Sequence, residues 1–302
     1  MTKISLNTHK FSLEQQISEH HMILKKEFPE QEFSFLGKGG LNFIFSTRFK
    51  GKKITLRVCN DKEIFENFSF IREKINMTKI NHPNLSKVYS RILNTGIMLI
   101  EYCGEVSFEQ RFSRTNKFIL KNNFIAYHKV MKAVEYLISQ ELVHCDLKCG
   151  NILFHRHENN PKIIDYDTLK KSDSKETYDI IFCSLGFAAP ELFTQEINDK
   201  IDIFGLGSIL YKLTQVKEVF RCSTTVYLLD NAFKEYEEYK EQLKEPLPYY
   251  DIPIGNNKTL KELINKMREP EPENRIGIYK AIDMFESAMP KEIKSRLKHP
   301  IP

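Results

Sequence analysis

Thirteen residues near the middle of the chain, 142–154, read LVHCDLKCGNILF. They combine a histidine, two cysteines, an aspartate, a lysine and an asparagine, and then become apolar. This mixture is compatible with a metal site, a cysteine nucleophile or a loop that handles phosphate. A polar turn that enters a buried strand, without any chemistry, is the fourth interpretation. The rest of the sequence decides among the four.

Composition and charge limit the class of protein. The 302 residues are 41% hydrophobic and 28% charged, which suits one large globular domain or two lobes. The net charge of +5 is spread among acidic residues, so no nucleic-acid partner is expected. No apolar run approaches the roughly 20 residues that span a bilayer, and no signal sequence is recognisable. The six cysteines are scattered, which predicts reduced thiols in the cytoplasm, or in a host cytosol for a secreted effector of an intracellular microbe: Cys59, Cys103, Cys145, Cys149, Cys183 and Cys222.

The first third of the chain predicts a helix followed by a small sheet. Apolar residues at helical spacing follow Ser12, a typical cap residue, and predict an appended helix within residues 1–32. From Phe33 the pattern changes to alternation, interrupted by one helical stretch, 61–80, that ends before His82 and Pro83. The alternating segments predict five strands: 32–36, 42–49, 52–58, 87–93 and 96–102.

Beyond Gly104 the periodicity is mainly helical. The clearest helices are predicted over 122–140, 202–214 and 259–267. The fold class is therefore α+β and bilobal, with a β-rich N-lobe and a mainly helical C-lobe. The expected division is an N-terminal extension, two lobes and a C-terminal tail: 1–32, 33–103, 104–290 and 291–302.

Two of the four interpretations of residues 142–154 fit the spacing poorly. A zinc site would use His144, Cys145, Cys149, His155 and His157, but zinc sites favour paired ligands such as C-x2-C with a second pair farther away. A nucleophilic Cys145 or Cys149 lacks a local base and orienting group. A bland polar turn explains the apolar NILF but not the three functional polar residues.

The phosphate interpretation gives each of those three residues a role. Asp146 can accept or orient a hydroxyl proton, Lys148 can neutralise a transferring phosphoryl group, and Asn151 offers a neutral oxygen to a metal ion. The segment resembles the catalytic loop H-R-D-L-K-x-x-N of the eukaryotic-type protein kinases, with Cys145 in place of the arginine.

Other motifs follow in the order of that family, so the resemblance covers about residues 33–288. In IIDYD, Asp165 matches the D-F-G aspartate that holds Mg²⁺ on ATP, with Tyr166 for the Phe and Asp167 for the Gly. CSLGFAAPE carries Ser184 near the expected substrate position. The resemblance implies that Asp202 supports the catalytic loop and that Arg275 in PENRIG pairs with Glu191 of Ala189-Pro190-Glu191.

The segment FLGKGGLNFIF resembles the glycine-rich loop of the same family. Gly37 and Gly39 occupy glycine positions, Asn42 stands at the third, Lys38 lies between the first two, and Ile44 would pack on adenine. A Rossmann turn needs a helix directly after the glycines, whereas the following residues alternate like a strand. A plain structural turn is the other interpretation of this element. We favour a hairpin that covers phosphates.

The remaining nucleotide contacts are implied by position. Arg57 stands where the family has the V-A-I-K lysine, and Glu73 has the spacing of its glutamate partner, with Glu66 as a competing assignment. Ile100 matches the gatekeeper position, and Glu101 to Cys103 would offer backbone groups to adenine.

The resemblance implies transfer of the γ-phosphoryl group of ATP, with Mg²⁺ or Mn²⁺, to Ser or Thr of a protein substrate. Arg57 opens two alternatives, because a planar guanidinium does not simply replace a compact ammonium. Either Arg57 pairs with Glu73, with help from Lys38 or Lys53, or the protein is a pseudokinase scaffold. A small-molecule kinase is a further alternative. The absence of arginine at Cys145 predicts activity that needs no phosphorylation of the activation segment.

Overall fold

The computed structural model describes most of the chain. The described positions are residues 12–39, 42–59, 75–92, 95–112, 117–155, 159–174, 180–184, 186–194, 196–214, 224–228, 239, 241, 243, 247 and 257–298. The chain divides into two compact units. One comprises Met1–Asn81 and Lys87–Tyr102, and the other comprises His82–Ser86 and Cys103–Pro302. The first is built on a sheet and the second is mainly helical, which confirms the predicted α+β class. The predicted division into four segments stays a prediction.

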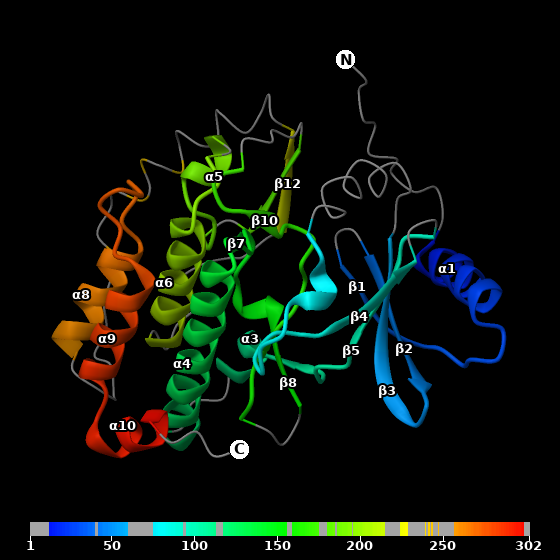
Figure 1. The fold of residues 1–302 in the computed structure, drawn as a ribbon, viewed down its shortest axis with the longest axis horizontal. Coiled ribbons are helices and arrows are strands. Elements are labelled where there is room, and N and C mark those ends of the chain that lie inside the picture. Colours follow the sequence, from blue (N-terminus) through cyan, green and yellow to red (C-terminus); the bar gives the residue numbers. More distant parts are fainter. Residues whose placement is uncertain are drawn as a thin grey trace. The chain divides into compact units, whose positions relative to one another are not determined.

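The sheet of the first unit has five antiparallel strands in the order β1-β2-β3-β5-β4 (Figure 1). Their bounds are Ser34–Lys38 (β1), Asn42–Phe49 (β2), Lys52–Cys59 (β3), Val88–Ile92 (β4) and Ile97–Glu101 (β5). The alternating pattern of the sequence thus predicted all five strands. Strand β1 lies at one edge of the sheet and, within the described part of the chain, pairs only with β2.

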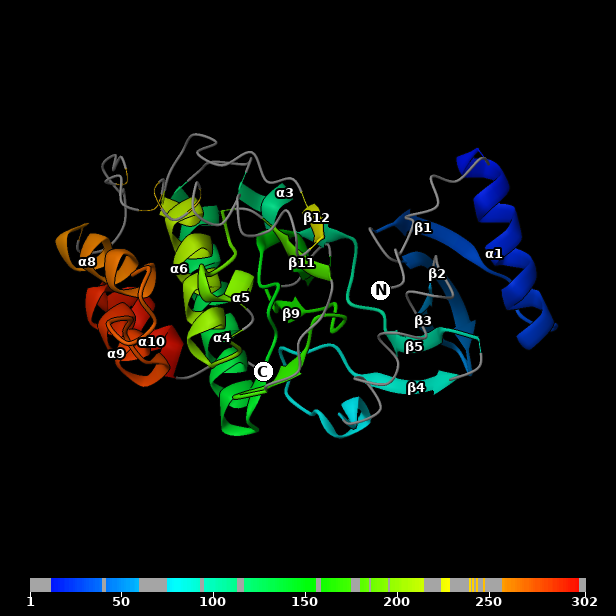
Figure 2. The same ribbon diagram turned by 90° about the horizontal axis from the view of Figure 1, so that it is seen from above.

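The two faces of this sheet have different surroundings. Side chains alternate between the faces along a strand, and one face packs on helix α1 (Leu13–Glu27) in a single hydrophobic cluster. Figure 2 shows α1 lying along the sheet beside β1, β2 and β3. The buried members of the cluster are Leu24, Phe43, Phe45, Ile54, Leu56, Val58 and Ile97. Arg57 pairs in register with Ile44 and Met98, so these three residues belong to the opposite face.

Helix α1 begins where the sequence predicted. The Oγ of Ser12 accepts the N–H of Gln15 at 3.3 Å, and the side chain of Gln15 accepts the N–H of Ser12 at 2.8 Å. This reciprocal pair is a capping box, which satisfies two backbone donors that would otherwise lack partners. The predicted N-terminal helix with Ser12 as its cap is therefore confirmed.

The helix predicted over 61–80 is only partly open to comparison, because residues 60–74 lie outside the described part of the chain. Its end was predicted wrongly. The α-helix does not continue to Ile80; Met77–Lys79 forms a single 3-10 turn. The side chain of Asn76 accepts the N–H of Thr78 at 3.3 Å, and an asparagine that bonds to its own local backbone competes with α-helix formation.

Helices dominate the second unit. They are α3 (Phe108–Phe112), α4 (Lys117–Ser139), α5 (Glu191–Thr194), α6 (Lys200–Thr214), α8 (Asn257–Met267), α9 (Ile278–Ala288) and α10 (Lys291–Lys298). The three helices predicted most clearly correspond to α4, α6 and α8. Helix α10 lies within the segment expected as a tail and buries Ile293. Within the described residues, no helix has both the length and the apolar character required to cross a membrane.

Helix α6 forms the centre of this unit. Nearly all of its side chains are buried, and α4 and α8 pack against it (Figure 1). A Cβ at Gly207 would lie 2.7 Å from the Cβ of Met267, so only glycine permits this close approach of α6 to α8. The helix is therefore a rigid base for the segments that lie on it.

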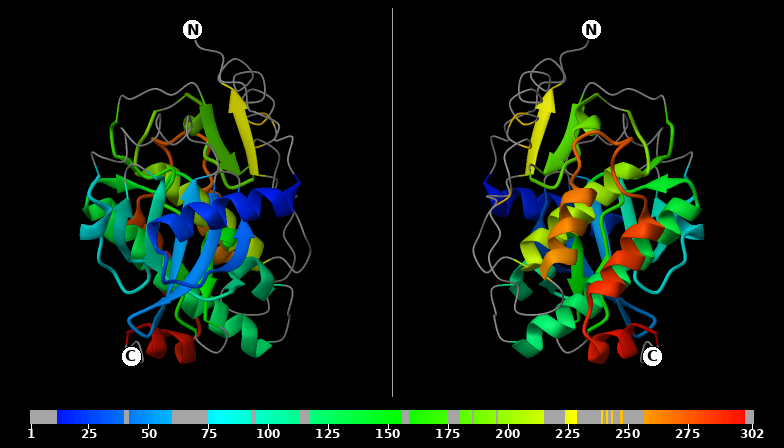
Figure 3. Two further views of the ribbon diagram at one scale, coloured as in Figure 1. Left: turned by 90° about the vertical axis from the view of Figure 1, so that its right-hand side faces the viewer. Right: turned by 90° about the vertical axis from the view of Figure 1, so that its left-hand side faces the viewer.

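Three small sheets, one of three strands and two of two strands, accompany the helices in the described part of the second unit. They are β6–β8–β9 (Val106–Ser107, Ile152–Phe154, Lys162–Ile163), β7–β10 (Leu142–Val143, Lys170–Lys171) and β11–β12 (Ile180–Ser184, Thr224–Leu228). Figure 3 shows the β11–β12 pair at one end of the unit. Strands β7 and β8 flank residues 144–151, which hold the candidate site.

A buried ion pair joins two distant parts of this unit. The guanidinium of Arg275 donates two bonds to the carboxylate of Glu191, at 2.6 and 3.0 Å, and Arg275 is 2% exposed. Its other donors reach the backbone oxygens of Glu269, Lys200 and Pro270. All sides of the buried charge are therefore satisfied, as such a group requires. The predicted pairing of Arg275 with Glu191 is confirmed.

Candidate active site

The loop formed by residues 144–151 is held by one carboxylate. Asp202 of α6 is 1% exposed, and its two oxygens accept the N–H of His144 at 2.7 Å and of Cys145 at 3.0 Å. Burial raises the pKa of this carboxyl, whereas nearby His144 and the two N–H donors lower it. Cys145 has a φ of +66°, a left-handed conformation that is uncommon for a residue with a side chain. The predicted support of the loop by Asp202 is confirmed.

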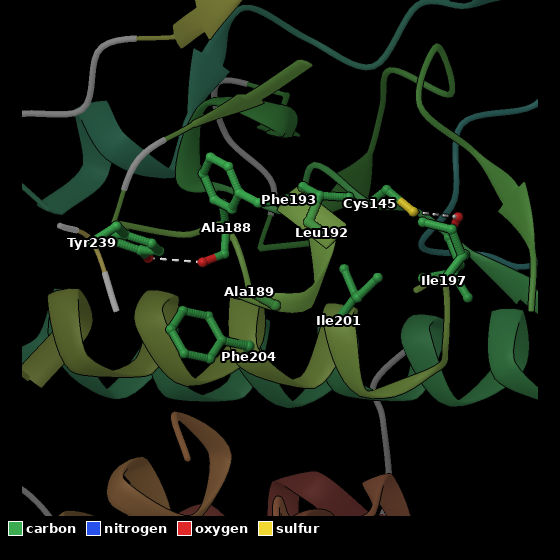
Figure 4. Close-up of a cluster of buried hydrophobic side chains, with 10 residues drawn as sticks. Cys145, Ala188, Ala189, Leu192, Phe193, Ile197, Ile201, Phe204 and Tyr239 are labelled. Atoms are coloured by element: carbon green, nitrogen blue, oxygen red, sulfur yellow. Dashed lines mark hydrogen bonds between the residues drawn. The ribbon is translucent and has the colours of Figure 1, made fainter. Parts of the chain in front are cut away.

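Cys145 is packed as an apolar residue. Figure 4 shows its side chain in a buried cluster with residues such as Leu192 and Ile197. Its thiol donates to the oxygen of Val143 at 3.6 Å, and burial, followed by the charge of Asp202, raises the pKa of the thiol well above its usual range. A thiol that stays protonated is a poor nucleophile, so this geometry does not support the nucleophile interpretation of Cys145.

The zinc interpretation also lacks structural support. Among the described residues, no group of three or more His, Cys, Asp or Glu could hold a metal ion. His157 lies outside the described part of the chain. His144 is instead buried, and its Nε2 donates to the oxygen of Ile164 at 3.0 Å. The histidine thus connects the loop to the segment that carries Asp165.

The side chains of Asp146, Lys148 and Ser184 are in mutual contact. The Nζ of Lys148 lies 2.6 Å from one oxygen of Asp146 and 2.8 Å from the Oγ of Ser184. That hydroxyl donates to the other oxygen of Asp146 at 3.0 Å. The structure therefore brings together the two predicted catalytic residues with Ser184, the last residue of β11. A carboxylate, an ammonium and a hydroxyl in mutual contact are the groups required to position an alcohol for phosphoryl transfer.

Opposing effects act on the carboxyl of Asp146. Burial raises its pKa, as does the nearby charge of Asp165, whereas the ammonium of Lys148 lowers it through charge and a hydrogen bond. Burial is the largest of these effects, so the pKa lies above the ordinary value of an aspartate. Lys148 is therefore the main group that favours the ionised form.

Asn151 and Asp165 offer oxygen ligands for a divalent cation. The Nδ2 of Asn151 donates to the backbone oxygen of Asp146 at 2.9 Å and to its carboxylate at 3.1 Å, so the amide presents its Oδ1 as the remaining acceptor. The N–H of Ile164 donates to the backbone oxygen of Asn151 at 2.9 Å. This bond holds the segment of Asn151 beside the segment that carries Asp165. An amide oxygen and a carboxylate suit Mg²⁺, which prefers hard oxygen ligands.

The backbone at Asp165 explains how the chain tolerates Asp167. Asp165 has a φ of +70°, whereas Asp167 does not have a positive φ. The left-handed residue in this segment is thus the predicted metal ligand, and position 167 does not need the conformational freedom of glycine. The hydroxyl of the neighbouring Tyr166 donates to the oxygen of Ser86 at 2.9 Å and holds the segment.

The glycine-rich residues of the first unit form a hairpin. β1 pairs with β2 with a shift of register between Phe35 and Gly37, and the N–H of Gly39 donates to the oxygen of Asn42 at 2.8 Å. A strand follows the glycines, which supports the hairpin over the Rossmann interpretation. Among the described residues, a Cβ at Gly37 would meet no atom within 4 Å, and one at Gly39 would meet only the backbone oxygen of Asn42, at 3.8 Å. The protein itself does not require glycine here, so the open backbone fits the approach of an outside group such as a phosphate.

Lys38 lies on the face of the sheet that α1 covers. Its Nζ donates to the side chain of Gln16 at 2.8 Å and lies 5.1 Å from the centre of the Phe43 ring. Ile44 belongs to the opposite face, with Arg57. The structure therefore places Lys38 and Ile44, both predicted to bind the cofactor, on different sides of the hairpin.

The other predicted nucleotide contacts are distributed over both units. Arg57 is 7% exposed in β3, and its predicted partner Glu73 lies outside the described residues. Glu101 ends β5, where its N–H donates to the oxygen of Lys87 at 2.8 Å. Cys103 is buried and belongs to the second unit. Their proposed contacts with adenine stay predictions.

A protein-family model described as the protein kinase domain matches residues 31–285. The chain belongs to the protein kinase family. This match spans both units, including the glycine-rich hairpin and the loop with Asp146. It confirms the predicted membership of the eukaryotic-type protein kinase superfamily, and with it the kinase fold that the sequence indicated.

Three similar proteins are kinases by name. Maternal embryonic leucine zipper kinase from Danio rerio is 23% identical over 260 residues, 83% of this chain and 36% of that protein. Aurora kinase from Encephalitozoon cuniculi is 26% identical over 255 residues, 82% and 89% of the two chains. Carbon catabolite-derepressing protein kinase from Candida glabrata is 25% identical over 260 residues, which are 82% of this chain and 40% of that protein. This kinase therefore spans less than half the length of two of the three relatives.

Sequence reasoning missed two hydroxyl groups of the kinase that stabilise the site. The Oγ1 of Thr168 donates to the backbone oxygen of His144 at 2.7 Å, so His144 is bonded through its oxygen as well as through the N–H that Asp202 accepts. The Tyr166 hydroxyl bonds to Ser86, eighty residues earlier in the chain. The replacement of Phe by Tyr was the available signal for the second contact. No local pattern marks Thr168.

Replacement of Asp202 by asparagine tests the support of the kinase loop. In Asp202→Asn one carboxylate oxygen becomes an amide NH₂ that faces a backbone N–H, so one charge-assisted bond is lost. We expect the free energy of unfolding to fall by about 2–3 kcal/mol, measured by urea denaturation near pH 7. Asp283→Asn, at an exposed position of α9, is the matched control and should change stability by less than about 0.5 kcal/mol. Equal losses in both variants would contradict the special role of Asp202.

Proposed function

We propose that this chain is a serine/threonine protein kinase that transfers the γ-phosphoryl group of ATP to a hydroxyl group of a protein substrate. The observation that carries this proposal is the contact of Asp146 with Lys148 and Ser184. The names of the similar proteins support protein substrates, and the retained lysine together with Ser184 supports serine or threonine as the acceptor.

The residues around Asp146 would act mainly by position and charge. One carboxylate oxygen of Asp146 orients the acceptor hydroxyl and receives its proton as the new P–O bond forms and ADP leaves. Lys148, held 2.6 Å from Asp146, lies where a cation offsets negative charge on the transferred group. Ser184 bridges both side chains and limits their motion.

Asn151 and Asp165 are the proposed ligands of Mg²⁺ or Mn²⁺. When bound, the metal ion neutralises the phosphates of ATP and orients them for transfer. The bonds from Asn151 Nδ2 to Asp146 keep the amide oxygen turned outward, and Ile164 fixes the distance between the two ligand-bearing segments. The protein therefore supplies a preorganised pair of oxygen donors.

The nucleotide itself would lie against the face of the sheet that carries Ile44 and Arg57. In this proposal Ile44 packs on adenine, backbone groups of Glu101 and Cys103 bind its edge, and the backbone around Gly37 and Gly39 covers the phosphates. Arg57 replaces the usual lysine and would pair with Glu73. Its burial in β3 supports an adapted pocket, since an isolated buried charge would be strongly unfavourable.

Arg57 also supports the second candidate, a scaffold that binds nucleotide or partners without efficient phosphoryl transfer. A guanidinium presents five donors in a rigid fork, which differs from a single ammonium between phosphates. We favour the active enzyme because the proposed base and both metal ligands are retained. A small-molecule kinase is less consistent with the buried pair of Glu191 and Arg275, which belongs to the part of the fold expected to support protein substrates.

We place this activity in the cytoplasm, or in a host cytosol for a secreted effector. Four of the six cysteines, Cys59, Cys103, Cys145 and Cys149, are free thiols, which suits a reducing compartment. The substrate is a protein of unspecified sequence, and no nucleic-acid partner is proposed.

Labelled ATP separates the enzyme from the scaffold. Incubation with [γ-³²P]ATP, Mg²⁺ and generic protein substrates should label protein with the wild type, and Asp146→Asn should lower the rate by at least about 100-fold, because the proton acceptor is lost. Arg57→Lys should lower transfer further than the control Asp283→Asn, because the buried pocket is adapted to a guanidinium.

Three other outcomes of this assay have distinct meanings. Equal labelling by wild type and Asp146→Asn would refute the enzyme. A nucleotide-dependent thermal shift without transfer, with activity gained in Arg57→Lys, would select the scaffold. Labelling of a sugar or amino alcohol but of no protein would select the small-molecule kinase.

The pH dependence of transfer should report the carboxyl of Asp146. The ionised form accepts the proton, so kcat/KM should fall on the acid side as Asp146 becomes protonated. Lys148 lowers the pKa of Asp146, and its removal in Lys148→Met should therefore raise this pKa and move the acid limb to higher pH. Lys291→Met, at an exposed position of α10, should leave the limb unchanged. A limb that stays in place in both variants would show that another group titrates.

Activity should not depend on phosphorylation of the activation segment. A buried neutral thiol at Cys145 provides no positive charge for a phosphorylated residue, and the loop is instead fixed by Asp202 and Thr168. Treatment of the purified protein with a phosphatase, checked by mass spectrometry, should leave the transfer rate unchanged. A large drop in rate would overturn this expectation.

A further inference from the structure

One face of α1 carries a polar side chain at a buried position. Gln16, His20 and Leu24 follow each other at intervals of four residues and are the buried residues of the helix. Leu24 enters the hydrophobic cluster beneath α1, as expected for this face. Gln16 is 6% exposed, and a buried amide requires hydrogen-bond partners. The presence of a glutamine at this position therefore needs a specific explanation.

The glutamine contacts the glycine-rich hairpin, formed by β1 and β2. Its Oε1 accepts a bond from the Nζ of Lys38 at 2.8 Å. Lys38 is the last residue of β1 and directly precedes Gly39. The chain therefore connects a residue of α1 to the backbone position between the two glycines, across 22 residues of sequence.

Aromatic contacts surround this bond. The ring of His20 stacks on Phe43 of β2 at a centroid distance of 4.1 Å, and its Nδ1 donates to the backbone oxygen of Gln16 at 2.7 Å. The ammonium of Lys38 lies 5.1 Å from the same Phe43 ring. Because a cation over an aromatic face is attracted to it, the ring reinforces the position of Lys38. Gln16 and Phe43 thus form a binding place for Lys38, and His20 packs on Phe43.

Strand β1 contacts the rest of the sheet through β2, where the Phe35 ring lies 6.2 Å from the Phe43 ring and 5.5 Å from the Phe45 ring between centroids. It is the edge strand of the sheet, most of its side chains are exposed, and its register with β2 is shifted near Gly37. The hairpin is the segment expected to cover the phosphates. A backbone that binds phosphate does so more strongly when its geometry is already set in the free protein.

We propose that α1 is a functional part of the nucleotide site, in which Gln16 is a positioning residue that holds the glycine-rich hairpin through Lys38. This inference rests on the proposed function, because the hairpin matters only if nucleotide binds beneath it. It reassigns Lys38 from a phosphate ligand to an attachment point for α1. The two assignments predict opposite effects of Gln16→Leu on ATP binding. Binding weakens if Gln16 positions the hairpin, and it tightens if α1 withholds Lys38 from the phosphates.

Binding of Mg²⁺·ATP and of adenosine, measured by isothermal titration calorimetry, distinguishes the assignments. Gln16→Leu keeps the size of the buried side chain but removes the acceptor, and Lys38→Met removes the donor. Each should weaken ATP binding about fivefold, as expected for loss of one partly exposed bond to a charged group. The double variant should lose no more than either single variant, because both remove the same contact. Adenosine, which lacks phosphates, should bind all four proteins equally.

Control variants separate position from stability. Gln16→Glu keeps an acceptor for Lys38 and should retain wild-type affinity for ATP. Glu19→Ala and Lys26→Met change exposed residues of α1 and should leave binding unchanged. Thermal unfolding in the absence of nucleotide identifies any variant that has lost its fold, and for such a variant the comparison rests on Gln16→Glu and Lys38→Met.

The outcomes distinguish this inference from the proposed function. If Gln16→Leu tightens ATP binding while Lys38→Met weakens it, Lys38 is a phosphate ligand that α1 withholds, and the proposal is overturned. Additive losses, or unchanged affinity in both single variants, would also overturn it. If the wild type transfers no phosphate but the variants weaken ATP binding as stated, the proposed enzyme fails and the role of α1 stands. If the wild type binds no nucleotide, both fail.

Discussion

The carboxylate of Asp202 is the constraint on which the candidate site depends. It is charged and almost fully buried, so its free energy is acceptable only while both oxygens receive donors. The donors are the N–H groups of His144 and Cys145, and the second belongs to a residue in a left-handed conformation. The two hydrogen bonds to Asp202 thus offset the backbone strain at Cys145. They also fix the backbone that leads into Asp146. Because nearly all side chains of α6 are buried, the carboxylate that holds the loop belongs to a well-packed helix.

This arrangement explains why the loop can lose its arginine. An arginine before the catalytic aspartate acts by binding a phosphate elsewhere, and that phosphate then orders the segment. Here the loop and the segment that carries Asp165 are joined without a phosphate: His144 bonds to Ile164 on one side of Asp165, and Thr168 on the other side bonds to His144. Cys145 can accordingly be an apolar residue that packs beneath the loop. In the proposed kinase, constitutive order of this kind would replace a regulated charge pair.

Local patterns in the sequence predicted the elements and the long-range pairs that accompany known motifs. Alternation identified the strands, and the order of the motifs predicted the pairing of Glu191 with Arg275. The end of the helix before Ile80 was missed because an asparagine at 76 closes a local turn, which periodicity does not register. The bond of Gln16 to Lys38 was missed for another reason. It depends on how α1 packs on the sheet, and neither residue belongs to a pattern that indicates the other.

The departures from the family pattern do not bear equally on chemistry. Asp167 replaces a glycine at a position where the backbone has no positive φ, so nothing in the local geometry opposes it. Cys145 replaces an arginine, and we propose that the hydrogen bonds of the loop carry the ordering role of that residue. Arg57 is different, because it occupies a buried position in β3 on the same face as Ile44, where the nucleotide is proposed to bind. The local backbone thus accommodates Asp167, and the buried cluster accommodates Cys145. The proposed catalysis depends on how the pocket accommodates the guanidinium of Arg57.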